Sequence, residues 1–175
     1  MVAAVILAAG ASTRFGAPKQ RLLLGPVLER VRTSSVDDVV VVTGAYEVET
    51  DARVVHCDEW EYGPGASLRC GLAALDGTVE AAVVILADGP DLDPRAIERV
   101  VAAWQDTRAD VVAASYDGTR LHPVVIARDA WDRIPDEGAR ALEARLVPCD
   151  DLDPPGDVDF ADELPGRLRP GRGEP

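Results

Sequence analysis

A phosphate-binding loop is predicted near the amino terminus, where glycines and two cations follow an apolar segment. Lys19 is the only lysine among the 175 residues, and Gly10 and Arg14 precede it in the same loop. Residues 2–7, directly before the loop, have the composition of a buried strand. Backbone N–H groups of such a loop converge on an anion, and the two cations neutralise the charge that remains. The segment therefore predicts a triphosphate site.

A second candidate is a carboxylate that ends another apolar run. Residues 81–87 are continuously apolar, and Asp88 follows them. Ligands of open α/β sheets bind outside the carboxyl ends of the strands, so Asp88 and the loop are expected at one edge. A carboxylate there suits Mg²⁺, which is commonly held by one or two carboxylates together with substrate phosphates. The alternative is that Asp88 only caps the turn at Gly89.

The elements that must position these residues follow from the hydrophobic pattern. Apolar strand patterns alternate with amphipathic helical ones, which predicts an α/β fold: a three-layer α/β/α sandwich with a mostly parallel, Rossmann-like sheet. A helix is predicted after the N-cap signal Asp93-Pro94, and an irregular helical region over residues 128–145. Strands are predicted at residues 2–7, 39–43, 53–56, 81–87, 111–114 and 121–127, the last one antiparallel, and another helix around residues 68–75.

Domain organisation and composition narrow the function classes. We expect one domain over residues 1–164 and a disordered tail over residues 165–175, which are rich in Pro and Gly. The net charge of −13 argues against a nucleic-acid binder. No run approaches the roughly 18 apolar residues of a membrane span. Three cysteines without Cys-x-x-Cys spacing argue against a disulfide framework and a zinc site, and predict a cytoplasmic protein.

The loop matches neither the P-loop nor the dinucleotide fingerprint. Its pattern Leu-Ala-Ala-Gly-x-Ser-x-Arg-Phe-Gly-x-Pro-Lys over residues 7–19 resembles the signature of the MobA-like NTP transferase superfamily, most closely the molybdenum cofactor cytidylyltransferases. Further segments resemble that family in the same order, at residues 41–44, 60–72, 86–90, 117–124, 138–142 and 157–159. The resemblance implies a fold of the nucleotide-diphospho-sugar transferase type.

The resemblance also implies a reaction. An acceptor phosphate would attack the α-phosphorus of a nucleoside triphosphate and release pyrophosphate, with CMP moving from CTP to molybdopterin. Ala9, where purine-using relatives tend to carry Gly, favours a pyrimidine. The alternatives are GTP as donor, a sugar-phosphate acceptor, or a non-catalytic nucleotide- or cofactor-binding protein of the same fold. Mg²⁺ is the expected cofactor, with Mn²⁺ as an alternative, and a molybdoenzyme or a maturation chaperone is a candidate partner.

Site residues follow from the matched motifs. Arg14, Lys19 and Asp88 are the expected catalytic residues, with Asp88 holding the metal and Asp159 as candidate second ligand. For Asp159 the alternative is a solvated acidic surface. His122 and Pro123 are expected to contact the acceptor, although an isolated histidine is more often structural. The expected nucleotide-binding residues are Leu7, Ala8, Ala9, Gly10, Ser12, Thr13, Arg14, Lys19, Ser67 and Arg69, where the last two have the alternative of a helix cap and a solvated arginine.

The chain departs from the family pattern at three places, one of which is Phe160-Ala161, where Thr-Pro usually follows the closing Asp-Ile-Asp. Residues 20–39 are shorter than the family usually is, so residues 22–28 are expected to compress a turn before a helix of about two turns. Gly89 replaces the larger residue expected between Asp88 and Pro90.

Overall fold

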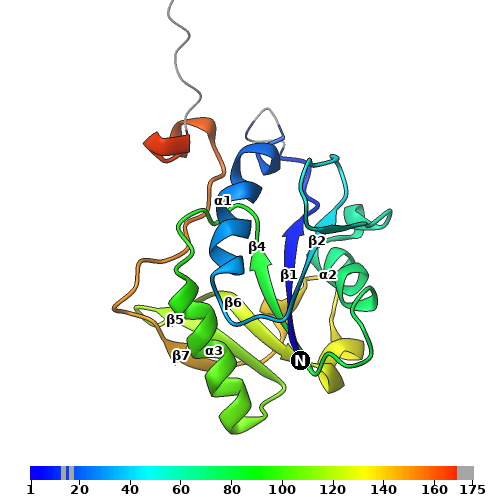
Figure 1. Ribbon diagram of the computed structural model, residues 1–175, viewed down its shortest axis with the longest axis vertical. Helices are drawn as coiled ribbons and strands as arrows, with labels where there is room; N and C mark the ends of the chain where they lie inside the picture. Colours follow the sequence, from blue (N-terminus) through cyan, green and yellow to red (C-terminus); the bar gives the residue numbers. More distant parts are fainter. Residues whose placement is uncertain (13–14, 16–17, 169–175) are drawn as a thin grey trace, which may run out of the picture.

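A single sheet organises the computed structural model, which describes residues 1–12, 15 and 18–168. Its strand order is β3-β2-β1-β4-β6-β5-β7 (Figure 1). All paired strands are parallel except β6, which runs antiparallel to both β4 and β5. The predicted mostly parallel sheet is confirmed. The strands are β1 (Val2–Ala8), β2 (Asp38–Thr43), β3 (Arg53–His56), β4 (Ala81–Leu86), β5 (Val111–Tyr116), β6 (Thr119–Ala127) and β7 (Arg145–Pro148).

Helices cover both faces of the sheet, as expected for three layers. Helices α1 (Gln20–Arg32) and α3 (Pro94–Thr107) lie on one face, and α2 (Pro64–Ala73) lies on the other (Figure 1). The alternation of side chains along β1 explains the two cores. Ala4 and Ile6 belong to the core under α1 and α3, whereas Ala3 and Val5 belong to the core under α2. No helix in the described ranges is long and apolar enough to cross a membrane.

Two segments differ from the sequence-based expectation. Helix α1 has 13 residues rather than about two turns, and it contains Pro26. Its apolar face, including Leu24 and Val27, is buried, and this packing compensates for the hydrogen bond that a proline lacks. Residues 128–145 form short 3-10 turns and lead into the unpredicted edge strand β7. The 3-10 turns are η1 (Trp60–Tyr62), η2 (Arg128–Arg133), η3 (Ala139–Ala141), η4 (Ala161–Glu163) and η5 (Gly166–Leu168).

The carboxyl-terminal segment packs against the loop region. Leu168, within the predicted tail, joins a small apolar cluster with Phe15 and Leu23. Residues 169–175 lie outside the described part of the chain. Residues 166–168 form the turn η5, and the disordered tail stays a prediction.

A disulfide joins Cys57 to Cys70, with their Cα atoms 5.8 Å apart. It ties the chain just after β3 to helix α2, and Cys149 is free and buried. The expectation that the cysteines form no disulfide is wrong. An odd number of cysteines leaves one over but does not prevent the other two from meeting in space.

Candidate active site

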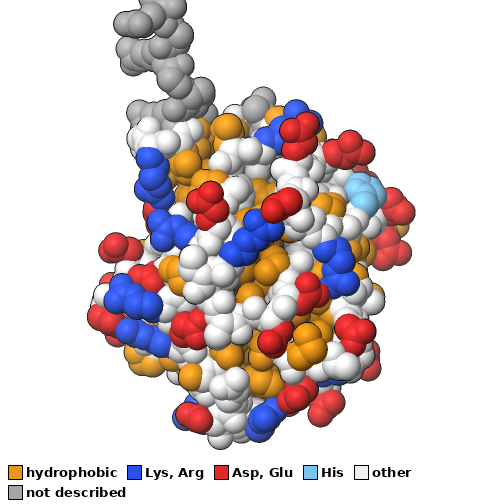
Figure 2. Space-filling model, in the orientation of Figure 1, with side chains coloured by type: hydrophobic (Ala, Val, Ile, Leu, Met, Phe, Trp, Pro, Cys, Tyr) orange, Lys and Arg blue, Asp and Glu red, His pale blue; other side chains and the backbone are white. Residues whose placement is uncertain are grey.

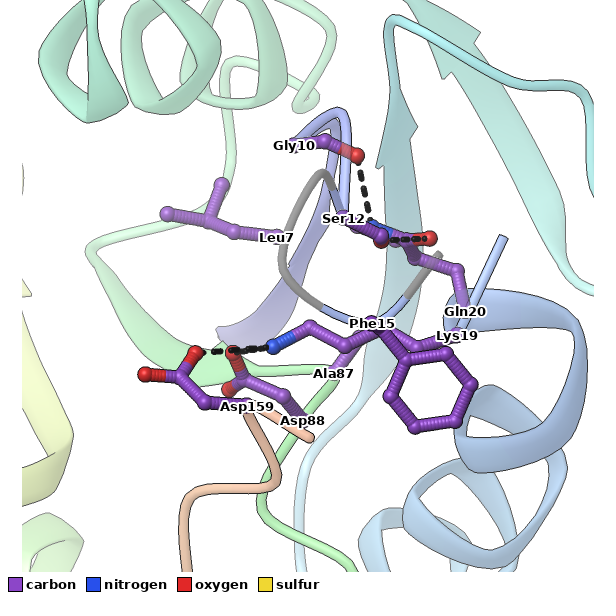
Figure 3. A pocket seen from close by; sticks show the side chains of 10 residues that line it. Leu7, Gly10, Ser12, Phe15, Lys19, Gln20, Ala87, Asp88 and Asp159 are labelled. Carbon is purple, nitrogen blue, oxygen red and sulfur yellow. Dashed lines mark hydrogen bonds and ion pairs between the residues drawn. The ribbon is translucent and has the colours of Figure 1, made fainter. Parts of the chain in front are cut away.

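A pocket lies at the carboxyl ends of β1 and β4, which are adjacent parallel strands with Leu7 opposite Leu86. The glycine-containing loop predicted to bind phosphate leaves β1 here, and Asp88 follows β4 by two residues. The cavity has a volume of about 250 Å³ (Figure 3). It is lined by Leu7, Ala8, Gly10, Ser12, Phe15, Lys19, Gln20, Ala87, Asp88 and Asp159.

The ammonium group of Lys19 is the centre of this pocket. Lys19 precedes the first turn of α1, and its residue exposure is only 9%. Its Nζ atom lies 2.7 Å from the carbonyl oxygen of Val158, 3.1 Å from Oδ2 of Asp88 and 3.5 Å from Oδ1 of Asp159. Figure 3 shows the three side chains pointing toward one another. The structure thus brings the lysine and the acid of the sequence analysis into direct contact.

Asp159 reaches the pocket through backbone contacts of its segment. The N–H of Val158 donates to the carbonyl of Asp88 at 3.1 Å. The N–H of Asp159 donates to the carboxylate of Glu163 at 2.8 Å. These bonds fix the segment beside Asp88, although 70 residues of sequence separate the two acids.

Gln20, which was not among the predicted site residues, holds the loop through two hydrogen bonds. Its amide Nε2 donates to the carbonyl of Gly10 at 2.7 Å, and its Oε1 accepts from the hydroxyl of Ser12 at 2.8 Å. Gln20 is buried. Ser12 has a φ of 51°, a left-handed conformation that a non-glycine residue rarely adopts, so the loop requires this support. An uncharged amide carries no charge pattern in the sequence, which explains the omission.

The other predicted loop residues fall into three groups. Leu7, Ala8, Gly10 and Ser12 line the pocket. Ala9 is buried, and its carbonyl accepts the N–H of Ala45 at 3.0 Å, which ties the loop to the chain after β2. Thr13 and Arg14 lie outside the described residues.

Ser67 and Arg69 do not line this pocket. Arg69 instead donates to the carbonyl of Ile134 at 2.9 Å and to the carboxylate of Asp136 at 2.8 Å. Ser67 is buried in the first turns of α2. The guanidinium of Arg69 thus anchors the 134–136 segment to α2, and the nucleotide contacts expected of Ser67 and Arg69 stay predictions.

A second cavity, of about 310 Å³, adjoins the first. Leu7 lines both cavities. The walls of the second cavity are mostly apolar and include Pro64, Val84, Leu86, Leu121 and Val124. Polar groups come from Arg120, His122, Glu137 and Asp157. Arg120 is held in place by donating to the carbonyls of Leu142 and Ala139 at 2.6 and 2.9 Å.

His122 is a buried imidazole in this second cavity. Neither ring nitrogen has a hydrogen-bond partner among the described residues, and burial lowers its pKa to about 4, with the nearby Asp88 charge acting in the opposite direction. A Cβ atom at position 89 would lie 2.6 Å from Nε2 of His122. The glycine found between Asp88 and Pro90 therefore makes room for the imidazole. The peptide bond from His122 to Pro123 is cis.

The acids of the first pocket fit a divalent cation bound together with phosphates. Oδ1 of Asp88 is buried without a hydrogen-bond partner in the described chain, whereas buried polar atoms normally have one. No cluster of three or more His, Cys, Asp or Glu side chains able to hold a metal occurs within the described ranges. Two carboxylates completed by phosphate and water oxygens suit Mg²⁺ better than an all-protein cage would.

Comparisons with known proteins identify the family of the chain. The family model of the MobA-like NTP transferase domain matches residues 4–148. The bifunctional protein GlmU of Sorangium cellulosum (strain So ce56) is 27% identical over 154 residues, which cover 75% of this chain and 32% of that protein. The chain thus spans about a third of the length of this curated relative.

Solved structures with a similar fold include three mycobacterial ones. The homologue of Mycobacterium tuberculosis Rv0371c from Mycobacterium sp. strain JC1 is 28% identical, with a TM-score of 0.77 and coverage of 92% of this chain and 91% of that one. Rv0371c of Mycobacterium tuberculosis H37Rv is 25% identical, with the same TM-score and coverage of 92% and 93%. A manganese complex of Rv0371c shares the fold at 22% identity and a TM-score of 0.65, with coverage of 84% and 87%.

Proposed function

Because this chain belongs to the MobA-like NTP transferase domain family and is thereby a nucleotidyltransferase, we propose that it transfers CMP from CTP to molybdopterin and releases pyrophosphate. The observation that carries the proposal is the contact of Lys19 with Asp88 and Asp159 beside the glycine-containing loop. A cation and two acids at the carboxyl ends of β1 and β4 are suited to a nucleoside triphosphate bound with a divalent cation.

The chemistry requires stabilisation of growing negative charge. Charge develops on the α-phosphate and on the departing pyrophosphate, so fixed donors and cations supply most of the rate. Lys19 would provide a point charge and the loop would provide N–H groups, while the role of Arg14 stays a prediction. Asp88 and Asp159 would hold Mg²⁺, or Mn²⁺ in its place, and the ion would neutralise phosphate oxygens. The acceptor phosphate is ionised near neutral pH, so the proposal needs no general base.

The second cavity is the proposed acceptor site. Its apolar walls suit an uncharged ring system, and His122 beside Pro123 offers polar atoms for hydrogen bonds. Leu7 would then separate the two substrates, since its side chain lines both cavities. The acceptor phosphate would approach from the His122 side toward the α-phosphate.

The base preference is proposed from Ala9. Its side chain is buried beneath the loop, so the methyl group stiffens the backbone that would contact the base. A molybdoenzyme or a maturation chaperone stays a candidate partner. A cytoplasmic location also stays a prediction, although the Cys57–Cys70 disulfide removes the cysteine-based argument for it.

A pyrophosphate-release assay tests the proposal. CTP, GTP, ATP and UTP are each offered with molybdopterin or with a sugar 1-phosphate, with and without Mg²⁺. Release that requires CTP, molybdopterin and Mg²⁺ supports the proposal. Release with GTP or with a sugar phosphate supports the corresponding alternative substrate instead.

An Asp88→Asn variant tests whether Asp88 binds the metal ion. We expect it to fold like the wild type and to lose the response to Mg²⁺, because the amide removes the charge that holds the cation. A metal titration that looks like that of the wild type would exclude Asp88 as a ligand. No release with any donor and acceptor pair would favour a non-catalytic binding protein.

A further inference from the structure

The hydrogen bonds of Lys19 are already complete in the free protein. A lysine ammonium has three N–H donors. In the structure, these donors have three acceptors, on Val158, Asp88 and Asp159. The side chain is also 89% removed from solvent, since its exposure is 11%. Lys19 in this position therefore has no donor left for a phosphate oxygen.

The ammonium also contacts the two carboxylate oxygens that a shared cation would bind. Mg²⁺ binds oxygen at about 2.0–2.1 Å, so an ion that contacts both acids must come close to these oxygens. The Nζ atom of Lys19 already lies 3.1 Å from Asp88 Oδ2 and 3.5 Å from Asp159 Oδ1, so the ammonium and the ion compete for the same two groups. The other oxygen of Asp88, Oδ1, is buried away from solvent. An entering cation therefore meets acids that the lysine already holds.

The backbone that carries the two acids is held by hydrogen bonds, whereas the long side chain of the lysine can move. Asp88 and Val158 are joined through their backbones at 3.1 Å, and Asp159 is held by Glu163 at 2.8 Å. Lys19 reaches them through a flexible four-carbon side chain. Its weakest contact is the 3.5 Å pair with Asp159, so this contact is the first to release.

We infer that Lys19 is an internal counter-ion that takes the place of the divalent cation in the free protein. Entry of the cation displaces the ammonium from the acid pair and makes its N–H donors available to an anion. Only the last step, transfer of the ammonium to nucleotide phosphates, rests on the proposed function. The exchange between lysine and cation needs no nucleotide, so it can be tested separately.

The first test uses the wild-type chain, in which Lys19 is the only lysine. The acetylation rate of Lys19 by an N-hydroxysuccinimide ester is followed by peptide mass spectrometry, with the N-terminal amine as internal reference. Saturating Mg²⁺ without nucleotide should raise the rate about tenfold, because the population shifts from the buried to the released position. An unchanged ratio of the two rates at a saturating Mg²⁺ concentration would overturn the inference.

The second test measures Mn²⁺ affinity by electron paramagnetic resonance without nucleotide. Lys19→Met should bind Mn²⁺ at least about tenfold more tightly than the wild type, because the competing charge is gone. Arg21→Met is the matched control, because it also removes one positive charge, but from an exposed side chain two residues further along the sequence. We expect Arg21→Met to stay within about twofold of the wild type.

The outcomes separate this inference from the proposed function. Equal affinities of the wild type and Lys19→Met, or no Mn²⁺ binding to either, would refute the exchange. Equal gains in both variants would show only a general charge effect and would also refute it. If Lys19→Met does not fold, the acetylation test decides alone. Exchange without any pyrophosphate release would leave the inference standing and the proposed reaction wrong.

Discussion

Val158 is bonded to Asp88 through the backbone, with its N–H donating to the Asp88 carbonyl at 3.1 Å, while its own carbonyl accepts from Lys19 at 2.7 Å. One residue near the carboxyl terminus thus contacts both the strand-end acid and the lysine of the loop. The pocket is consequently assembled from three distant parts of the sequence. Changes at any of them should alter ligand binding.

Gln20→Leu should loosen the phosphate loop while nearly preserving side-chain volume. The change removes hydrogen bonds of 2.7 and 2.8 Å and leaves the carbonyl of Gly10 without that donor. We expect unfolding free energy to fall by about 1–3 kcal/mol and nucleotide affinity to fall about tenfold. Urea unfolding and isothermal titration calorimetry measure the two effects.

The control for this variant is Gln105→Leu, at the only other glutamine, which is exposed on α3. It should leave nucleotide affinity as in the wild type. Equal affinity in Gln20→Leu and Gln105→Leu would show that the Gln20 contacts do not shape the loop.

Gly89→Ala should damage the second cavity rather than the first. The added Cβ would lie 2.6 Å from Nε2 of His122 and 3.1 Å from the carbonyl of Pro155, so the imidazole must move. Overpacking of this kind costs about 1–3 kcal/mol. We expect a higher KM for the acceptor and an unchanged Kd for the nucleotide. Gly77→Ala, where no atom lies within 4 Å of the new Cβ, is the control. A rise in nucleotide Kd without a change in acceptor KM would contradict the assignment of the cavities.

His122 should make the protein acid-sensitive. Burial lowers its folded pKa to about 4, whereas the unfolded chain takes up the proton near pH 6.5. The stability contributed by neutral His122 is therefore complete above pH 6.5 and is lost as the pH falls toward 4, by up to about 3 kcal/mol.

Urea unfolding at pH 7.0 and pH 4.5 tests this dependence. His122→Asn should show a smaller loss between the two pH values than the wild type, because the carboxylates that also titrate are common to both proteins. His56→Asn, at the exposed second histidine, is the control. A wild-type loss equal to that of His122→Asn would show that the imidazole does not stay neutral in the folded state.

Reduction of the Cys57–Cys70 disulfide should destabilise the domain. The bond spans a sequence separation of 13, for which loop-closure entropy gives about 3 kcal/mol. Urea unfolding of a Cys149→Ala protein, with and without a phosphine reductant, measures the difference without interference from the third cysteine. Equal midpoints in both conditions, with two free thiols found before reduction, would mean that the disulfide does not form.

Six of the seven strands and two of the helices were predictable because their signals are local. Continuous apolar runs identified β1 and β4, and the Asp93-Pro94 pair identified the start of α3, where Asp93 does accept the N–H of Arg95 at 2.9 Å. Helix α1 was predicted too short because residues 22–28 were assigned to a compressed turn, whereas they form part of the helix and bury its apolar face. Strand β7 was missed because it is a short, largely exposed edge strand without alternation.

The site was predictable where charge and motif coincide and not where packing decides. Lys19 and Asp88 stand out in the sequence, since one is the only lysine and the other ends a strand. Gln20 acts through two neutral hydrogen bonds, and the Cys57–Cys70 pair depends on the approach of α2 to β3. Arg69 looked like an anion ligand, yet its partners come from residues 134–136, which no local pattern connects to α2.

The position of Leu7 on the wall between the two cavities has a consequence for altering specificity. If the first cavity holds the donor and the second the acceptor, as proposed, libraries directed at one cavity should leave the preference of the other unaffected. Leu7 is the exception, because a smaller side chain at this position would enlarge both cavities. We therefore expect a substitution at a position that lines only one cavity to change either the donor preference or the acceptor preference. A substitution of Leu7, or of a residue in contact with it, should change both.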